Sequence, residues 1–337
     1  MDDVTSSVHP GAEPGARWTA GNEPARATPR PYAGAADLDL IRDLIRDGWR
    51  SRGPLTQVHP GDFEWWIATS PDADWVSRIA LWEAPDGRLL GWTFHRKPPP
   101  GELDWFVHPD HRDDALRRRM LDWFEQRVAE DAASGSSPDR LTVWAADSDQ
   151  ELMRLLEREG FERSQDWYTH RARPLSDGGG EPVDPAPGYT VRQVDADADI
   201  AARVDVHRAA FAPSAVTVDA YRRVMSSATY RPELDLVAVA PDGAFGAFCI
   251  VWLDEPTRIA LFEPVGTHPE HRRRGLARAV CREGLRRAAA LGAEAAIVLA
   301  WNGEDAANRL YESLGFRDVM RSYRYRREYR QRRDVAA

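Results

Sequence analysis

The chain has 337 residues, of which 42% are hydrophobic, and a formal net charge of −9 at neutral pH. The length suits two domains, and the negative charge argues against a general nucleic-acid binder. No apolar run is long enough to span a membrane and the N-terminus lacks a signal-peptide core, so we expect a cytoplasmic protein without a membrane partner. Cys249 and Cys281 are expected as buried thiols rather than as a disulfide.

Two stretches rich in glycine and proline divide the chain. Residues 1–31 show no hydrophobic periodicity and predict a disordered segment, while residues 174–188 predict a linker. The linker separates a first domain at 32–173 from a second domain at 189–328, and residues 329–337 form a basic tail.

The two domains repeat each other. HPDHR at 108–112 returns as HPEHR at 268–272, and REGFERS at 158–164 returns as SLGFRDV at 313–319. The offsets are 160 for the first pair and 155 for the glycines of the second pair. Matching elements at a nearly constant offset predict a duplicated domain.

Each half has the same predicted order of elements. Helices come first, at 38–49 and 200–211, and strands follow up to the His-Pro turn. A long amphipathic helix, a strand and a short helix come next, and a glycine, Gly160 or Gly315, ends the short helix. A final strand completes the half. This order predicts a mixed α/β sheet in both domains.

The stretch VGTHPEHRRRGLARA at 265–279 is suited to holding a pyrophosphate. A strand leads into three arginines, and Gly275 then opens an amphipathic helix. Free N–H groups at a helix start and the helix dipole bind anions, and glycine lets the backbone approach closely. The alternative is a solvated arginine cluster at a helix start.

The spacing Arg272-x-x-Gly275-x-Ala277 resembles the acyl-CoA signature of the GCN5-related N-acetyltransferase (GNAT) superfamily. The resemblance covers nearly all of residues 32–328 and implies two tandem GNAT folds. It also implies an N-acetyltransferase that uses acetyl-CoA and needs no metal. Mycothiol synthases share the layout of a decayed first domain and an active second one.

The resemblance implies a set of CoA contacts in the second half. In the family, the strand before the arginine loop separates from its neighbour, and the pantetheine arm lies along the exposed backbone. By position, Val265 and Thr267 would bind that arm. The pyrophosphate would be held by Arg272, Arg273, Arg274, Gly275, Leu276 and Ala277.

A second motif, AANRLYESLGF at 306–316, places Tyr311 where family members often protonate the departing thiolate. Its alternative role is packing on an amphipathic helix. Asn302 and Asn308 are expected to bind the pantetheine amides, with a helix N-cap as the alternative for Asn302. The family's usual asparagine seven residues before the tyrosine is here Glu304.

Glu263 is the candidate general base. It lies in the apolar strand IALFEPV shortly before the arginine loop, and a carboxylate relaying through water can take the proton of an ammonium group. Alternatively, Glu263 binds the ammonium without catalysing, or lies at a strand end in solvent.

The first half has lost these residues. Ala115 replaces Gly275, and Asp113 and Asp114 replace two of the arginines, so carboxylates stand where phosphates would bind. Leu156 replaces the tyrosine. We therefore expect a degenerate copy that does not acetylate. Its many tryptophans are expected mainly in the core, with Trp65 and Trp66 in a loop as candidates for a substrate pocket.

The sequence as a whole predicts acetyl transfer from acetyl-CoA to the primary amine of a small molecule, catalysed by the second domain. Two other functions stay open: a non-catalytic CoA-binding sensor or interaction protein, and a protein or peptide N-acetyltransferase. Further expectations are a homodimer as a possible assembly and no nucleic-acid partner.

Overall fold

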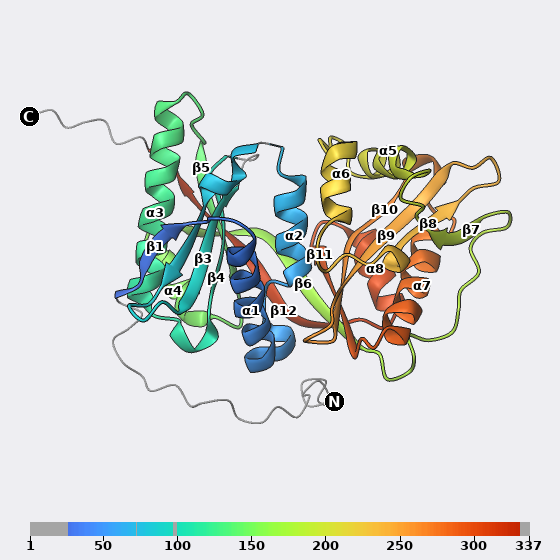
Figure 1. Cartoon of the computed structure of the whole chain (residues 1–337), viewed down its shortest axis with the longest axis horizontal. Coiled ribbons are helices and arrows are strands. Elements are labelled where there is room, and N and C mark those ends of the chain that lie inside the picture. Colours follow the sequence, from blue (N-terminus) through green and yellow to red (C-terminus); the bar gives the residue numbers. More distant parts are fainter. Residues whose placement is uncertain (1–25, 72, 97–99, 331–337) are drawn as a thin grey trace, which may run out of the picture. The chain divides into compact units, whose positions relative to one another are not determined.

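The computed structural model describes residues 26–71, 73–96 and 100–330, so most of the expected N-terminal segment and most of the basic tail lie outside it. The described residues form two compact units, each built from several segments of the chain (Figure 1). We call residues 58–71 and 169–319 the C-terminal unit. We call residues 26–57, 73–168 and 320–330 the N-terminal unit.

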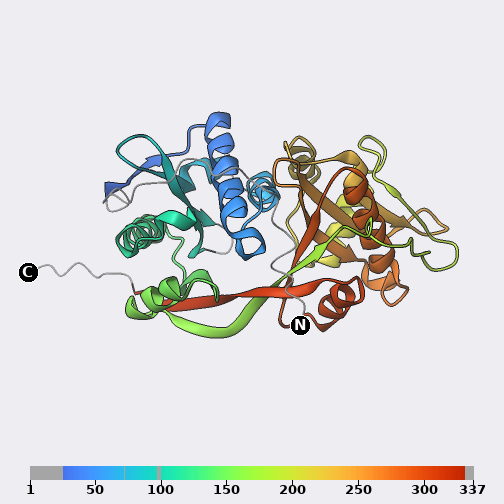
Figure 2. The ribbon, with the colours of Figure 1, turned by 90° about the horizontal axis from the view of Figure 1, so that it is seen from below.

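The N-terminal unit has a mixed sheet with helices on both faces. Helix α1 (Ala35–Arg52) packs through Gly48 against Phe106, while α3 (Asp114–Ala133) packs with Trp105 in the core of the opposite face. Adjacent strand residues point to opposite faces, which puts the two helices on either side of the sheet (Figure 2). In sheet order its strands are β1 (Thr28–Pro31), β2 (Ile79–Glu83), β3 (Leu89–Arg96), β4 (Glu102–Val107), β5 (Arg140–Ala146) and β12 (Arg317–Glu328). A further α-helix of this unit is α4 (Gln150–Arg158).

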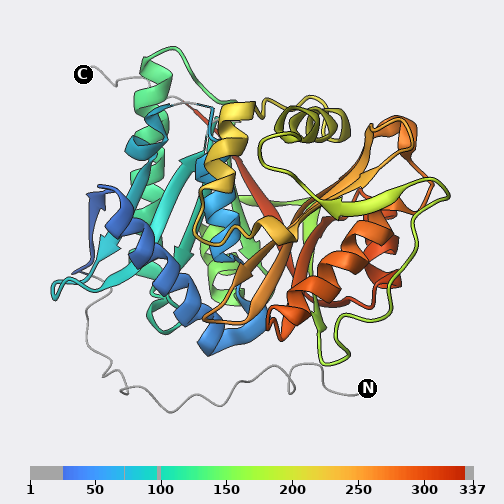
Figure 3. The same ribbon diagram turned by 45° about the vertical axis from the view of Figure 1, so that its right-hand side comes forward.

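The C-terminal unit repeats this plan (Figure 3). Helices α7 (Leu276–Ala290) and α8 (Asp305–Ser313) share a core with one face of its sheet. Helices α5 (Ile200–Ala210), α6 (Val218–Met225) and α2 (Pro60–Thr69) cover the other face. In sheet order the strands are β6 (Glu162–Pro174), β11 (Ala295–Trp301), β10 (Ile259–Thr267), β9 (Phe245–Asp254), β8 (Asp235–Val239) and β7 (Thr190–Gln193).

Each half of the sequence ends in a strand that lies at least partly in the unit formed mainly by the other half. Residues 320–328 of β12 pair antiparallel with β5, from Ser322 opposite Ala146 to Glu328 opposite Arg140. Residues 169–174 of β6 lie in the C-terminal unit, and β6 is the neighbour of β11. The predicted linker at 174–188 therefore separates the two sequence repeats. The compact units do not follow this boundary, because each contains part of the last strand of the other repeat.

Helix α2 is a further segment from the first half that lies in the C-terminal unit. Its Glu64 is buried and accepts hydrogen bonds from the amide (3.0 Å) and the hydroxyl (2.7 Å) of Thr229. Arg223 donates to the carbonyl of Ala68 over 3.0 Å. Trp65 and Trp66 lie in this helix, so the expectation of a loop at these residues was wrong.

The core of the C-terminal unit explains the spacing of the apolar residues in α7. Leu276, Val280, Gly284 and Ala288 are buried against the sheet. A Cβ atom at Gly284 would lie 3.0 Å from side-chain atoms of both Phe262 and Val251, so glycine lets the helix approach the strands closely. Cys249 and Cys281 are free, buried thiols in this core, as predicted.

Candidate active site

Strands β10 and β11 pair over only part of their length. They are parallel neighbours at Ile259–Leu261, opposite Ala295–Ile297, and no pairing continues beyond those residues within the described structure. The rest of β10 stays paired with β9 on its other side. Val265 and Thr267 lie beyond the point where the pairing ends, and both are partly exposed. On the side away from β9, this part of β10 has no strand partner among the described residues, so an added extended segment can pair with it.

A β-bulge places Glu263 next to this edge. Phe262 lies opposite Val251 and Val265 lies opposite Cys249, so β10 contains one more residue than β9 across this interval. The main-chain carbonyl of Glu263 accepts a hydrogen bond of 2.5 Å from the indole nitrogen of Trp252. Glu263 itself is partly exposed, which suits a carboxylate that exchanges protons with water.

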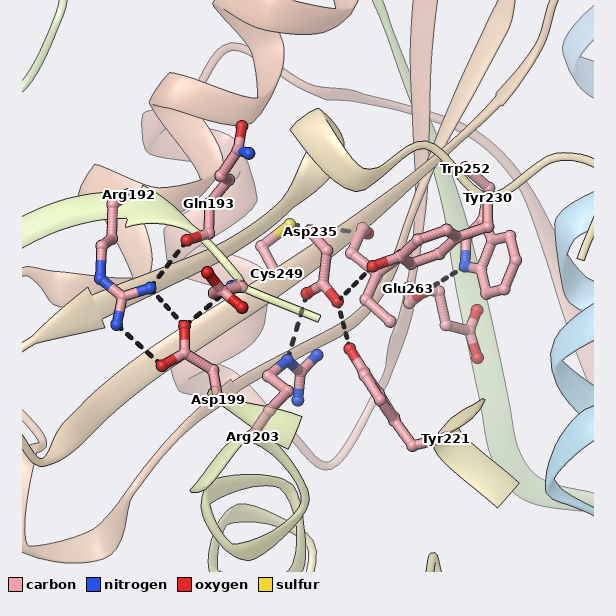
Figure 4. A network of polar contacts seen from close by, with 12 residues as sticks. Arg192, Gln193, Asp199, Arg203, Tyr221, Tyr230, Asp235, Cys249, Trp252 and Glu263 are labelled. Carbon is pink, nitrogen blue, oxygen red and sulfur yellow. Dashed lines mark hydrogen bonds and ion pairs between the residues drawn. The ribbon is translucent and has the colours of Figure 1, made fainter. Parts of the chain in front are cut away.

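The side chain of Glu263 belongs to the face of the sheet that α5, α6 and α2 cover. Trp252 of β9 packs against α2, because a Cβ atom at Gly61 would lie 2.5 Å from it and its ring centre lies 6.5 Å from that of Trp65. Figure 4 shows Glu263 beside Trp252 on that face. We call this face of the sheet, which includes α2, the Glu263 face.

The arginine loop has the backbone of an anion site. Gly275 is the N-cap of α7 with φ of 71°, and no side chain caps the helix. Arg273 also has a positive φ, 62°, which is uncommon for a residue other than glycine. The first N–H groups of a 15-residue helix are thus left for an external acceptor.

The three arginines of this loop differ in their surroundings. Arg272 and Arg273 are exposed, and no described residue forms a hydrogen bond or ion pair with either side chain. Arg274 donates to the hydroxyl of Tyr189 over 3.1 Å, and that hydroxyl lies 2.8 Å from Nδ1 of His271. Two guanidinium groups are therefore available to an anion, while the third is held at the side of the loop.

Tyr311 lies on α8 with its side chain in the core shared with α7, and it is 5% exposed. Burial raises the pKa of Tyr311 well above its usual value near 10, and the neighbouring Cys281, Cys249 and Glu263 raise it further. A phenol in this environment stays protonated over the physiological range and can donate a proton.

Asn308 is already engaged within the unit. Its amide group donates to the carbonyls of Trp301 (3.1 Å) and Glu304 (2.9 Å) and accepts from Arg171 (2.7 Å). Asn302 does not cap α8, because the N-cap of this helix is Glu304. The structure therefore contradicts the capping alternative for Asn302 and gives Asn308 a role in holding the start of α8.

Arg171, in the β6 segment of the C-terminal unit, was not predicted as a site residue. Its side chain is 5% exposed, and besides contacting Asn308 it donates to Asp318 over 2.7 Å and to Glu312 over 3.3 Å. It links α8 to the neighbouring strand. Nothing in the repeat pattern pointed to it, because β6 belongs by sequence to the first half.

The corresponding loop in the N-terminal unit is closed to anions. Asp113 caps α3 by accepting hydrogen bonds from the amides of Ala115 (2.6 Å) and Leu116 (3.2 Å). Arg117, which replaces Ala277, is buried and paired with Asp149 at 2.5 Å. A carboxylate of the chain thus occupies the helix start that is free in the C-terminal unit.

Residues 233–318, which include Glu263, the arginine loop and Tyr311, match the family model of an acetyltransferase (GNAT) domain. The C-terminal half carries a GNAT acetyltransferase domain. The chain is also similar to the mycothiol acetyltransferase of Nocardiopsis dassonvillei, with 27% identity over 264 residues that cover 68% of this chain and 76% of that relative. The GNAT domain and this relative together support an N-acetyltransferase, as the sequence predicted.

Solved structures show the same fold as this GNAT protein. A GCN5-related N-acetyltransferase from Sphaerobacter thermophilus aligns with a TM-score of 0.64 and 22% identity, covering 90% of this chain and 96% of that one. A tandem GNAT protein from the clavulanic acid biosynthesis pathway aligns with a TM-score of 0.63 and 17% identity, covering 90% and 98%. The predicted mixed α/β fold of tandem GNAT type is confirmed.

GNAT acetyltransferases generally use acetyl-CoA as the acetyl donor, which agrees with the donor expected from the arginine loop. None of the helices in the described part of the chain is both long and apolar enough to cross a bilayer.

Proposed function

We propose that this GNAT protein transfers the acetyl group of acetyl-CoA directly to the primary amine of a small molecule. The observation that supports the proposal is the position of Glu263 where β10 and β11 separate, with Tyr311 on α8, the helix that contacts β11. Glu263 lies at the bulge on one face of the sheet, and Tyr311 lies in the core of the other face. Burial raises the pKa of Tyr311 most, and the charges of Cys281, Cys249 and Glu263 raise it further.

The loop and the free edge of β10 account for donor binding. The pyrophosphate would accept hydrogen bonds from the backbone N–H groups around Gly275, Leu276 and Ala277, with Arg272 and Arg273 adding charge from the side. Arg274, held beside Tyr189, would add a further positive charge near the pyrophosphate. The pantetheine arm would lie along Val265 and Thr267 and extend toward Asn302 and Asn308.

Proton transfers accompany the bond changes. Glu263 takes one proton from the substrate ammonium through water, and the free amine attacks the thioester carbonyl. The carbon–nitrogen bond forms, the carbon–sulfur bond breaks, and Tyr311 gives its proton to the departing thiolate. The attacking nitrogen releases its second proton to water, and a proton from water restores the phenol of Tyr311. Because the amine attacks the thioester directly, no covalent enzyme intermediate is needed.

The N-terminal unit is proposed as a degenerate copy with no acetyl transfer of its own. Asp113 satisfies the helix start that an anion would need, and the Arg117–Asp149 pair introduces a buried charge network there. A fixed carboxylate at this position repels a phosphate.

The direct test measures CoA release and acetylated product with acetyl-CoA and a panel of small primary amines, with a peptide panel assayed in parallel. The proposal expects at least one amine to accelerate CoA release and to appear in acetylated form. Acceleration by peptides alone would indicate a peptide N-acetyltransferase. Binding of acetyl-CoA without acceleration by any acceptor would indicate a sensor.

A further inference from the structure

A fully buried ion pair lies on the Glu263 face of the C-terminal unit. Arg203 of α5 and Asp235 of β8 are both 0% exposed, and Nε of Arg203 donates to Asp235 over 3.2 Å. The other oxygen of Asp235 accepts from the hydroxyls of Tyr221 and Tyr230, the latter over 3.1 Å (Figure 4). The aspartate is therefore satisfied by three donors.

The arginine is not satisfied in the same way. Its two terminal nitrogens are buried and have no hydrogen-bond partner among the described residues. In Figure 4 a single dashed line reaches its guanidinium group, at Nε. Buried donors without a partner are costly and rare in folded proteins, and they mark places where water or a ligand completes the structure.

The aromatic surroundings hold the guanidinium but cannot replace its missing partners. Its central carbon lies 3.9 Å from the ring centre of Phe248 and 5.0 Å from that of Tyr221. Stacking on a ring face compensates part of the buried charge. It leaves the hydrogen-bonding edge of the guanidinium unused, because N–H bonds lie in the plane of the group.

His207 adds a second unpartnered group one turn further along α5. It is 5% exposed, and its Nδ1 is buried with no hydrogen-bond partner in the part of the chain that the structure describes. Positions four apart lie on one side of a helix, so Arg203 and His207 face the same region. The ring centre of Phe211, which is 43% exposed, lies 5.0 Å from that of His207. Phe211 thus connects the buried His207 with the surface of the unit.

We propose that Arg203 and His207 form a subsite for a carboxylate on the acceptor molecule. Two terminal nitrogens of one guanidinium match the two oxygens of a carboxylate, and the neutral imidazole supplies one more hydrogen bond. Arg203 already neutralises Asp235, so a bound carboxylate adds one net negative charge, which the two terminal nitrogens of Arg203 and the His207 ring stabilise through hydrogen bonds. The subsite lies on the same face of the sheet as Glu263. This inference rests on the proposed amine acetylation for the identity of the ligand.

The first test measures anion binding without turnover. The melting temperature of the full chain is followed by fluorimetry against sodium acetate, with sodium chloride at equal ionic strength as the reference. Acetate is expected to raise the melting temperature, and the effect should saturate at millimolar concentrations. The effect should be lost in Arg203→Lys, which keeps a charge beside Asp235, and retained in Arg192→Lys, which alters another arginine–aspartate pair of this unit.

His207→Phe provides a second variant in case Arg203→Lys does not fold, because it removes the neutral partner and leaves the ion pair intact. It should weaken the acetate effect about threefold or more. If wild-type protein shows no saturable response to acetate, the nitrogens bind water only and the proposal is overturned.

The second test assigns the anion to the acceptor. CoA release is compared for amines that differ only in a carboxylate, such as lysine with cadaverine and phenylalanine with phenethylamine. At least one pair should show a preference of about tenfold for the carboxylate in kcat/KM, and the subsite variants should reduce it. Turnover without such a preference overturns the assignment. A saturable acetate effect with no amine turned over would leave the anion site standing and reject the proposed reaction instead.

Discussion

The indole nitrogen of Trp252 donates a hydrogen bond of 2.5 Å to the main-chain carbonyl of Glu263, at the point where β10 contains its extra residue. A bulge disrupts the ladder locally, so its main-chain groups need other partners. Trp252 is fully buried and supplies one. The orientation of the proposed base therefore depends on a side chain from the neighbouring strand.

Replacing Trp252 by phenylalanine keeps an aromatic ring and removes the hydrogen bond. We expect kcat to fall about fivefold to tenfold, which corresponds to about 1 kcal/mol for one hydrogen bond, while the dissociation constant of acetyl-CoA stays within about twofold. Steady-state kinetics and calorimetry measure the two quantities. A large loss of donor affinity with unchanged kcat would place Trp252 in donor binding instead.

Gly61 of α2 lets that helix approach Trp252. A Cβ atom at Gly61 would lie 2.5 Å from the Cβ and Cγ atoms of Trp252, so Gly61→Ala must displace the tryptophan or the helix. We expect a loss of stability of about 1–3 kcal/mol together with a fall in kcat.

Gly48→Ala is the matched control for this substitution. Its Cβ would lie 2.6 Å from the ring of Phe106 in the N-terminal unit, so the local overpacking is similar. It should lower the melting temperature and leave kcat per folded molecule nearly unchanged. If both variants reduce kcat equally, the contact of α2 with Trp252 has no special link to catalysis.

The sequence predicted the arginine loop and the Tyr311 helix because short-range signals specify them: a glycine at a helix start and apolar residues at helical spacing. It did not predict that α2 belongs to the C-terminal unit or that the last strands are exchanged. Those features depend on pairings between residues far apart in the chain, such as Glu64 with Thr229 and Ser322 with Ala146. Duplicated halves offer two similar partners for the same strand, and local patterns do not choose between them.

Gly275→Ala tests the anion loop by its backbone alone. No atom outside the immediate chain neighbours lies within 4 Å of a Cβ at this position, so the only penalty is for a side chain at φ of 71°. Forcing alanine into the left-handed region costs about 1–2 kcal/mol. We expect alanine to leave this conformation in the free protein, so that acetyl-CoA must restore it and binds about tenfold more weakly, as measured by calorimetry.

Ala115→Gly is the counterpart in the N-terminal unit. Asp113 already satisfies the start of α3, so added backbone freedom should create no second donor site. Calorimetry should give one acetyl-CoA per chain for both this variant and the wild type. Two sites per chain would contradict the proposal of a degenerate copy.

Two buried histidines predict a dependence of stability on pH. Burial lowers the pKa of His170 to about 4, and burial together with the charge of Arg203 lowers that of His207 to about 3, from an ordinary value of 6.5. The unfolded chain therefore binds protons below pH 6.5 that the folded chain does not. The contribution of the two neutral histidines to the free energy of unfolding should be fully present above pH 6.5. It should decline as the pH falls, by up to about 1.4 kcal/mol per pH unit for each histidine.

Urea unfolding at pH 7 and pH 5 measures this effect. In His207→Phe the decline between the two values should be about half as large, because one of the two groups is removed. An unfolding free energy that does not change between pH 7 and pH 5 would show that neither histidine is kept neutral by the fold.

The central claim, that Glu263 and Tyr311 move the protons of acetyl transfer, is tested most directly by kinetics on the accepted amine. The account predicts that Glu263→Gln and Tyr311→Phe each lower kcat about 100-fold or more, while both still bind acetyl-CoA with nearly wild-type affinity. Wild-type kcat in both variants would contradict it.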